Sequence, residues 1–118
     1  MRTILLCSSL VFIAACAAKT AEGSVTIGGD TVVVTREGDL VAGSTTTFAC
    51  KVNDGAKVDD VQAWYGREDD TQRTTCDYDS KDGDYDCDVA IASVTTDAKL
   101  FIVVTKNGSS ETGSIAVH

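Results

Sequence analysis

Five aspartates in two neighbouring segments are the residues whose spacing points most directly to chemistry. The set is Asp77, Asp79, Asp84, Asp86 and Asp88. Side chains alternate between the two faces of a strand, so a hairpin over these segments would place all five carboxylates on one face. Like charges that face each other destabilise a strand pair, whereas a hard cation such as Ca²⁺ binds carboxylate oxygens. The acidic face therefore predicts a Ca²⁺ site as one interpretation.

A solvated acidic edge is the other interpretation of the same aspartates. Carboxylates on a flat strand face diverge into solvent, and charge on an edge strand discourages pairing with another chain. The calcium-loop pattern D-x-D-x-D-G is not met, because Lys81 occupies the third ligand position and Asp82 the glycine position. The second interpretation is favoured, and calcium is retained as the alternative.

Cysteine spacing predicts one disulfide and one free thiol. The sequence contains Cys7, Cys16, Cys50, Cys76 and Cys87. The first two lie in the N-terminal segment, which leaves three for the folded domain of an exported chain. A hairpin about Asp82-Gly83 puts Cys76 and Cys87 on the same face, and we predict that they are bonded. Cys50 is then a buried free thiol that packs as a small hydrophobe.

The N-terminal segment has the composition of an export signal. An apolar run at residues 4–15 follows Arg2, matches the length of a signal h-region and is too short to span a bilayer. Its end, Ile13-Ala14-Ala15-Cys16, resembles the bacterial lipobox, which implies that Cys16 is acylated and becomes the first residue of a lipid-anchored protein. Cleavage at an ordinary A-x-A-type site nearby would instead give a freely secreted protein.

Composition excludes several classes of function. The chain has 18 acidic and 10 basic residues and a net charge of −8, so it lacks the basic stripe that nucleic-acid binding requires. The single histidine, His118, is the last residue, and no Ser/His/Asp, zinc-ligand or phosphate-loop arrangement is present. Paired carboxylates for glycoside hydrolysis would need a cleft with apolar platforms, and aromatic residues are few. We expect a protein that is not an enzyme.

Segments rich in Val, Ile and Thr alternate with Gly, Asn and Asp clusters, which is typical of an antiparallel β-sandwich. Seven or eight short strands are predicted, at residues 25–27, 31–36, 45–52, 61–66, 73–79, 85–92, 99–106 and 113–117. Asp82-Gly83 and Asn107-Gly108 predict two tight hairpin turns. The organisation predicted is a signal peptide at 1–15, a disordered tether at 16–24 and a sandwich domain at 25–118.

The second half resembles bacterial immunoglobulin-like (Ig-like) modules of secreted and cell-surface proteins. The resemblance rests on Val61-Gln62-Ala63-Trp64-Tyr65, on the D-G-x-Y strand at residues 82–91 and on the last hairpin at 100–108. Trp64 and Tyr65 point to opposite faces, so one is expected in the core and the exposed one becomes a candidate for binding. An antibody-type version of the resemblance would pair Cys50 with Cys87 around Trp64 and would make Tyr85 the tyrosine corner.

Together these observations predict an Ig-like domain at a bacterial cell envelope, in the outer membrane if the source is Gram-negative. The membrane would be its partner through Cys16, with a protein or surface ligand as a second partner and no nucleic acid. No cofactor is predicted other than Ca²⁺ as an alternative. The role expected is adhesion, recognition or structural display, and a calcium-dependent structural module is the competing hypothesis.

Overall fold

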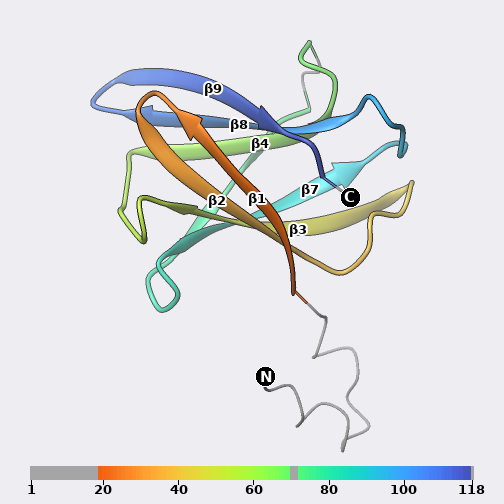
Figure 1. Ribbon diagram of the computed structural model, residues 1–118, viewed down its shortest axis with the longest axis horizontal. Helices are drawn as coiled ribbons and strands as arrows, with labels where there is room; N and C mark the ends of the chain where they lie inside the picture. The colour runs from red at the N-terminus through yellow and green to blue at the C-terminus, as the bar shows by residue number, and fades with distance from the viewer. Residues whose placement is uncertain (1–18, 70–71, 118) are drawn as a thin grey trace, which may run out of the picture.

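The computed structural model describes residues 19–69 and 72–117, and these form an all-β domain of two antiparallel sheets (Figure 1). The strands are β1 (Lys19–Ile27), β2 (Asp30–Glu37), β3 (Ser44–Val52), β4 (Asp60–Gly66), β5 (Thr74–Thr75), β6 (Asp77–Asp79), β7 (Asp84–Ile91), β8 (Lys99–Lys106) and β9 (Ser109–Ile115). The predicted fold class is confirmed.

Strand order gives the sandwich its Ig-like character. One sheet has the order β1-β2-β3-β7-β6 and the other has the order β5-β4-β8-β9. If β2, β3, β4, β6, β7, β8 and β9 are taken as strands A to G, the sheets become A-B-E-D and C-F-G, which is the arrangement of an Ig constant-type sandwich. The strands β1 and β5 are additions at one edge of each sheet.

Alternating side chains build the core between the sheets. On β3, Phe48, Cys50 and Val52 are fully buried, as their shared parity predicts. On β7, the odd-numbered residues from Tyr85 to Ile91 join the same core. The Tyr85 side chain is also fixed by hydrogen bonds to the main chain of Val58. Its hydroxyl donates to the Val58 carbonyl at 3.0 Å and accepts from the Val58 amide at 2.8 Å.

The first strand corrects the prediction of a disordered tether at residues 16–24. Strand β1 already begins at Lys19, which pairs with Glu37 at the end of β2. A bulge between Ala21 and Gly23 accompanies an ion pair between Glu22 and Arg36, with 2.7 Å between Oε2 and Nε and both side chains buried. Most other β1 side chains are exposed. The segment therefore lacks the alternation of apolar and polar residues that would predict a strand, although its backbone is paired with β2. Residues 16–18 lie outside the described residues.

Two other segments differ from their predicted bounds. The strand expected at 73–79 is divided, because Thr74–Thr75 pairs with β4 whereas Asp77–Asp79 pairs with β7, and Cys76 lies where the chain changes sheets. The last strand begins at Ser109 rather than at residue 113. Its early start follows from the two-residue turn of Asn107 and Gly108, both at positive φ, which places Lys106 opposite Ser109.

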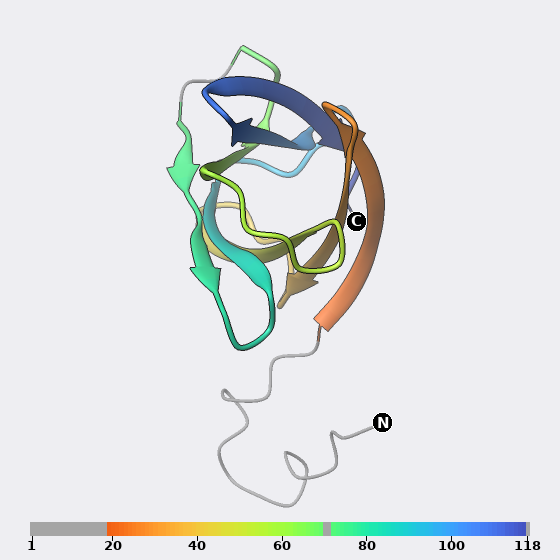
Figure 2. The same cartoon turned by 90° about the vertical axis from the view of Figure 1, so that its left-hand side faces the viewer.

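The two sheets meet along one edge of the sandwich, where β1 approaches β9 (Figure 2). A Cβ atom added to Gly113 of β9 would lie 2.6 Å from Cγ1 of Ile27. Glycine is therefore required at this position for the close contact between the two strands. The contact holds the added strand β1 against the second sheet as well as against β2.

Candidate functional site

The predicted disulfide between Cys76 and Cys87 is present and closes a loop with a sequence separation of 11. It joins the point where the chain changes sheets to the middle of β7. Cys50 is the free thiol, as expected, and its Sγ lies 4.0 Å from Sγ of Cys87. Both residues lie on neighbouring strands of one sheet, so the antibody-type bond between two sheets does not describe this domain.

Burial makes Cys50 chemically inert. Desolvation, together with the charges of Asp84 and Asp86, raises the pKa of the Cys50 thiol to about 12. The thiolate is the nucleophilic form of cysteine, and it is scarce at neutral pH in this environment. Cys50 therefore acts as a packing residue beside Phe48 rather than as a nucleophile.

Trp64 is not exposed, and this corrects one candidate for binding. It faces the outer side of its sheet, yet only 2 % of its surface is accessible, and it packs with Phe101 and Val103 in a cluster separate from the main core. The Trp64 and Phe101 rings stack with centroids 5.1 Å apart. The Trp64 indole Nε1 donates to the Arg67 carbonyl at 2.8 Å, and the Arg73 guanidinium lies 4.6 Å from the ring centroid. These contacts assign Trp64 a structural role.

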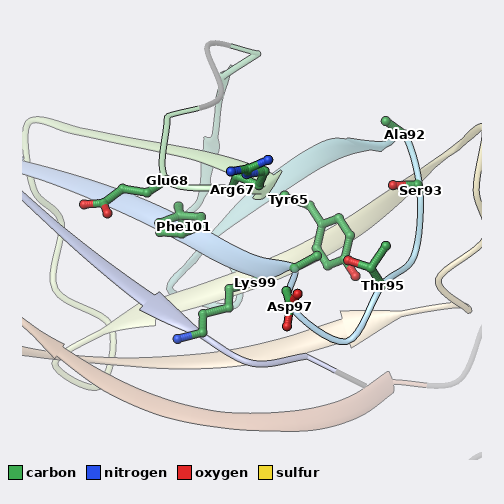
Figure 3. A pocket seen from close by; sticks show the side chains of 11 residues that line it. Tyr65, Arg67, Glu68, Ala92, Ser93, Thr95, Asp97, Lys99 and Phe101 are labelled. Atoms are coloured by element: carbon green, nitrogen blue, oxygen red, sulfur yellow. The ribbon is translucent and has the colours of Figure 1, made fainter.

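Tyr65, the second candidate, is also buried, at 7 % exposure, so neither residue is the exposed one expected; it lies in the core and lines a cleft at one end of the sandwich (Figure 3). The cleft has a volume of about 790 Å³ and lies between the loop after β4 and the loop that joins β7 to β8. Its wall carries both signs of charge, from Arg67, Glu68, Asp97 and Lys99. Phe101 adds an aromatic surface to the lining. The chain therefore has a concave surface at this end, with an aromatic part and charges of both signs.

A second groove of about 620 Å³ adjoins this cleft and shares Tyr65 with it. It lies between the β2–β3 and β7–β8 loops and is lined in part by Leu40, Val94 and Val117. Val41 and Val94 are the more exposed of the large apolar side chains in the described residues, at 53 % and 49 %. These two lie on the loops at the cleft end of the domain, whereas Val33, 42 % exposed, lies on β2.

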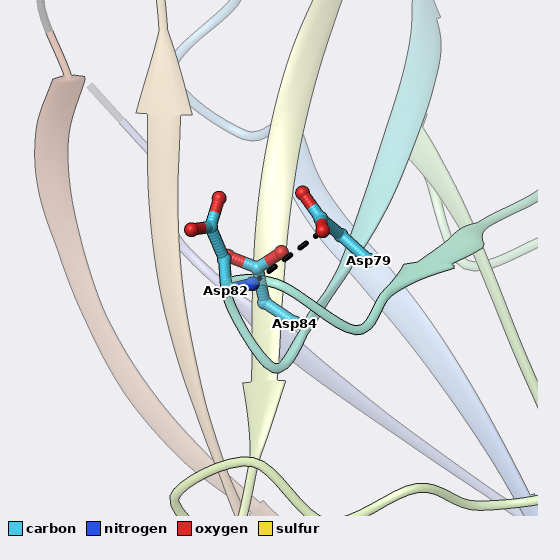
Figure 4. A group of neighbouring side chains, drawn as sticks. All are labelled: Asp79, Asp82 and Asp84. Atoms are coloured by element: carbon cyan, nitrogen blue, oxygen red, sulfur yellow. Dashed lines mark hydrogen bonds between the residues drawn. The ribbon is translucent and has the colours of Figure 1, made fainter.

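The structure places aspartates together on one face of the β6–β7 hairpin, but the aspartates that lie closest to one another are not the predicted set. Asp79, Asp82 and Asp84 bring one carboxylate oxygen each to within 4.8 Å of the others at the tip of the β6–β7 hairpin (Figure 4). Asp82 was not among the predicted ligands. It joins the group because the four residues between β6 and β7 turn back over the strand ends, with Gly83 at positive φ. The spacing D-x-x-D-x-D around a glycine turn is the sequence signal that could have identified it.

The other three predicted ligands lie outside this group. Asp77 is opposite Asp86 in the strand register, and Asp88 accepts a hydrogen bond from the Thr47 hydroxyl at 2.7 Å. Asp77 and Asp88 are exposed. The interpretation as a charged edge fits Asp77, because β6 is the last strand of its sheet, whereas Asp86 and Asp88 lie on β7, between β3 and β6.

Asp84 differs from its neighbours because its side chain is buried. The residue is 8 % exposed, and Oδ1 has no hydrogen-bond partner in the part of the chain that the structure describes. Burial raises the pKa of Asp84, with further contributions from the charges of Asp82 and Asp79. Buried polar groups in proteins are rarely left without partners, so Asp84 marks the hairpin tip as the unusual point of the acidic face.

The acidic face also predicts a dependence of stability on pH. Burial raises the pKa of Asp86 to about 6, and Asp84, Asp79 and Glu37 add to the effect, which Lys19 opposes. Between pH 4 and pH 6 the folded chain thus binds more protons than the unfolded chain, and stability falls as pH rises through 6. We expect the free energy of unfolding, measured by urea titration in a chelator, to be about 1 kcal/mol higher at pH 5.0 than at pH 7.5.

Asp86→Asn is the control for this pH effect, because it removes one titrating group and should reduce the difference, leaving the contribution of Asp84, whose pKa is raised in the same direction. Asp30 does not interfere in this range, since its hydrogen bond from Asn53 and its contact with Lys106 lower the pKa of its carboxyl. Its contribution changes only at more acidic pH. A wild-type protein that is more stable at pH 7.5 than at pH 5.0 would contradict the assignment.

Cys16, the predicted site of acylation, lies outside the described residues. Among the described residues, no helix is long and apolar enough to cross a membrane. Comparison of the chain with protein-family models, with curated proteins and with solved structures found no match in any of the three.

Proposed function

We propose that this chain is exported, anchored to a bacterial cell envelope by a lipid on Cys16, and displays an Ig-like domain that binds a partner without catalysis. The observation that carries the proposal is the sequence Ile13-Ala14-Ala15-Cys16 at the end of an apolar run, three residues before strand β1 begins at Lys19. A freely secreted form of the same domain is the alternative, and it differs only in the fate of Cys16.

The cleft at the end of the sandwich supports the binding part of this proposal. Loops held by a rigid sandwich are common positions for recognition, and this end combines a concave surface with the exposed residues Val41 and Val94. The charges of both signs from Arg67 to Lys99 suit a polypeptide segment that carries both signs itself. Tyr65 lies between the two grooves and is the residue we assign to this surface.

Mass spectrometry of the mature N-terminus, made from native cells, tests the anchor. We expect Cys16 to be the first residue and to carry two or three acyl chains, and the protein to fractionate with membranes. Cys16→Ser should release the protein from membranes or leave its leader uncleaved, whereas Cys50→Ser should fractionate like the wild type, because the lipid-bearing thiol is unchanged. An unmodified N-terminus beyond Cys16 would contradict anchoring and establish the secreted form.

The same fractions provide the readout for binding. Soluble domain is mixed with isolated envelopes, and retention is compared for wild type, Thr95→Arg in the cleft lining and Thr112→Arg on exposed β9. We expect Thr95→Arg to reduce retention at least tenfold while its melting temperature stays unchanged, and Thr112→Arg to retain binding. Equal retention of all three proteins, or of none, would contradict the cleft as a binding surface.

A further inference from the structure

The three carboxylates at the tip of the β6–β7 hairpin are spaced as ligands of one ion would be. Their oxygens lie within 4.8 Å of one another. Oxygens on opposite sides of a Ca²⁺ ion are about 5 Å apart, because Ca²⁺–oxygen distances are about 2.3–2.6 Å. Figure 4 shows the Asp84 carboxylate between those of Asp79 and Asp82. The positions are therefore compatible with simultaneous coordination and are costly as an array of bare charges.

Asp84 supplies an independent observation that points to a ligand. The residue is only 8 % exposed, and Oδ1 is shielded from solvent without any hydrogen-bond partner in residues 19–69 and 72–117. Lys19 and Lys51 are the cations whose charge acts on Asp84. Neither forms an ion pair with it among the described residues. A buried carboxylate oxygen without a donor is costly as a bare charge, and a proton or a bound cation can neutralise it.

We propose that Asp79, Asp82 and Asp84 form a Ca²⁺ site that fixes the tip of the β6–β7 hairpin. Oδ1 of Asp79 already accepts hydrogen bonds from the amides of Lys81, at 2.9 Å, and Asp82, at 3.4 Å, which holds the turn in place. Because Asp82 is exposed, water completes the coordination, and the affinity is in the range of extracellular calcium modules, with Kd about 10⁻⁴–10⁻³ M.

The site complements the disulfide of the same hairpin. Cys76–Cys87 holds the end of the hairpin where the chain changes sheets, and the ion holds the opposite end. The tip also touches the loop between β3 and β4, because a Cβ atom on Gly83 would lie 3.3 Å from Cα of Gly55. The Tyr78 hydroxyl donates to the Gly55 carbonyl at 3.1 Å. Calcium should therefore order this loop together with the hairpin.

Thermal melting of the purified domain at pH 7.5 tests the proposal, with 10 mM CaCl₂ compared with a chelator in NaCl of equal ionic strength. We expect Ca²⁺ to raise the melting temperature by about 5 °C or more, and isothermal titration to give one site per chain. Asp84→Asn should fold, because it removes a buried charge, and should lose the shift. Asp82→Asn, at an exposed position, should reduce the shift and serves as the second variant.

Asp77→Asn is the matched control, because it removes one charge from the same face without touching the group. It should keep the wild-type shift. An equal shift in all variants would show general screening of an acidic surface, and no shift in the wild type would show that Ca²⁺ does not bind; either result would overturn the proposal. The outcome does not depend on the state of Cys16, so it is independent of the function proposed above.

Discussion

Replacing Trp64 with alanine is expected to lower the free energy of unfolding by about 3–5 kcal/mol, the usual cost of removing a large buried aromatic side chain. The substitution removes the stack on Phe101, leaves the Arg67 carbonyl without its indole donor and withdraws the ring beneath Arg73. Because Trp64 is the only tryptophan, unfolding of the variant in urea should be followed by circular dichroism.

Trp64→Phe is the companion variant, since it keeps a ring to stack on Phe101 and loses only the hydrogen bond and part of the buried area. It should cost less than half as much as Trp64→Ala and keeps the prediction testable if the alanine variant does not fold. A Trp64→Ala protein as stable as the wild type would contradict the structural role. It would also restore Trp64 as a candidate for an exposed binding residue.

Loss of the Cys76–Cys87 bond is expected to cost about 3 kcal/mol, the value that chain entropy gives for a loop with a separation of 11. Cys76→Ser should show this loss in a urea titration, and reduction of the wild type with a small thiol should reproduce it. The effect should concentrate in the β6–β7 hairpin, because the bond ties the sheet-changing segment to β7. Hydrogen exchange of the amides of residues 77–79 would locate the loosening.

Cys50→Ala distinguishes this disulfide from the antibody-type pair. The thiol of Cys50 is free, so the variant should respond to reduction by the same amount as the wild type, whereas Cys76→Ser should not respond. The variant Cys76→Ser leaves Cys50 and Cys87 with sulfur atoms that are close in the parent structure, at 4.0 Å. Peptide mapping of that variant must therefore show two free thiols before its stability is interpreted.

Local alternation is the part of the fold that the sequence predicts well. On β3 and β7 one face consists of large apolar residues such as Phe48 and Val89, so burial follows directly from a period of two. Strand β1 lacks this signal because it is an edge strand whose side chains are mostly exposed, and its partner β2 defines it instead. The division at Cys76 was also missed, because the choice of sheet depends on contacts with β4 and β7 that no local pattern encodes.

The candidate sites were predictable to a similar degree. The alternation of side chains predicts that Asp79 and Asp84 share one face. Asp82 joins them only because of the conformation of the turn, which the alternation does not determine. The alternation of side chains also places Trp64 and Tyr65 on opposite faces of β4. It does not indicate that Arg73 lies over the outward-facing Trp64 ring. The cleft beside Tyr65 combines loops distant in the chain, so sequence reasoning had no means to assemble it.

The early start of β1 has a consequence for how an acylated form would sit. Only Ala17 and Ala18 separate Cys16 from Lys19, and three residue steps extend at most about 10 Å. The lipid headgroups would then lie almost against the sandwich, without a spacer segment between the domain and the membrane surface. A neighbouring protein could contact the faces of the domain that point away from the membrane or along it. The space between the domain and the membrane would be too narrow for a protein.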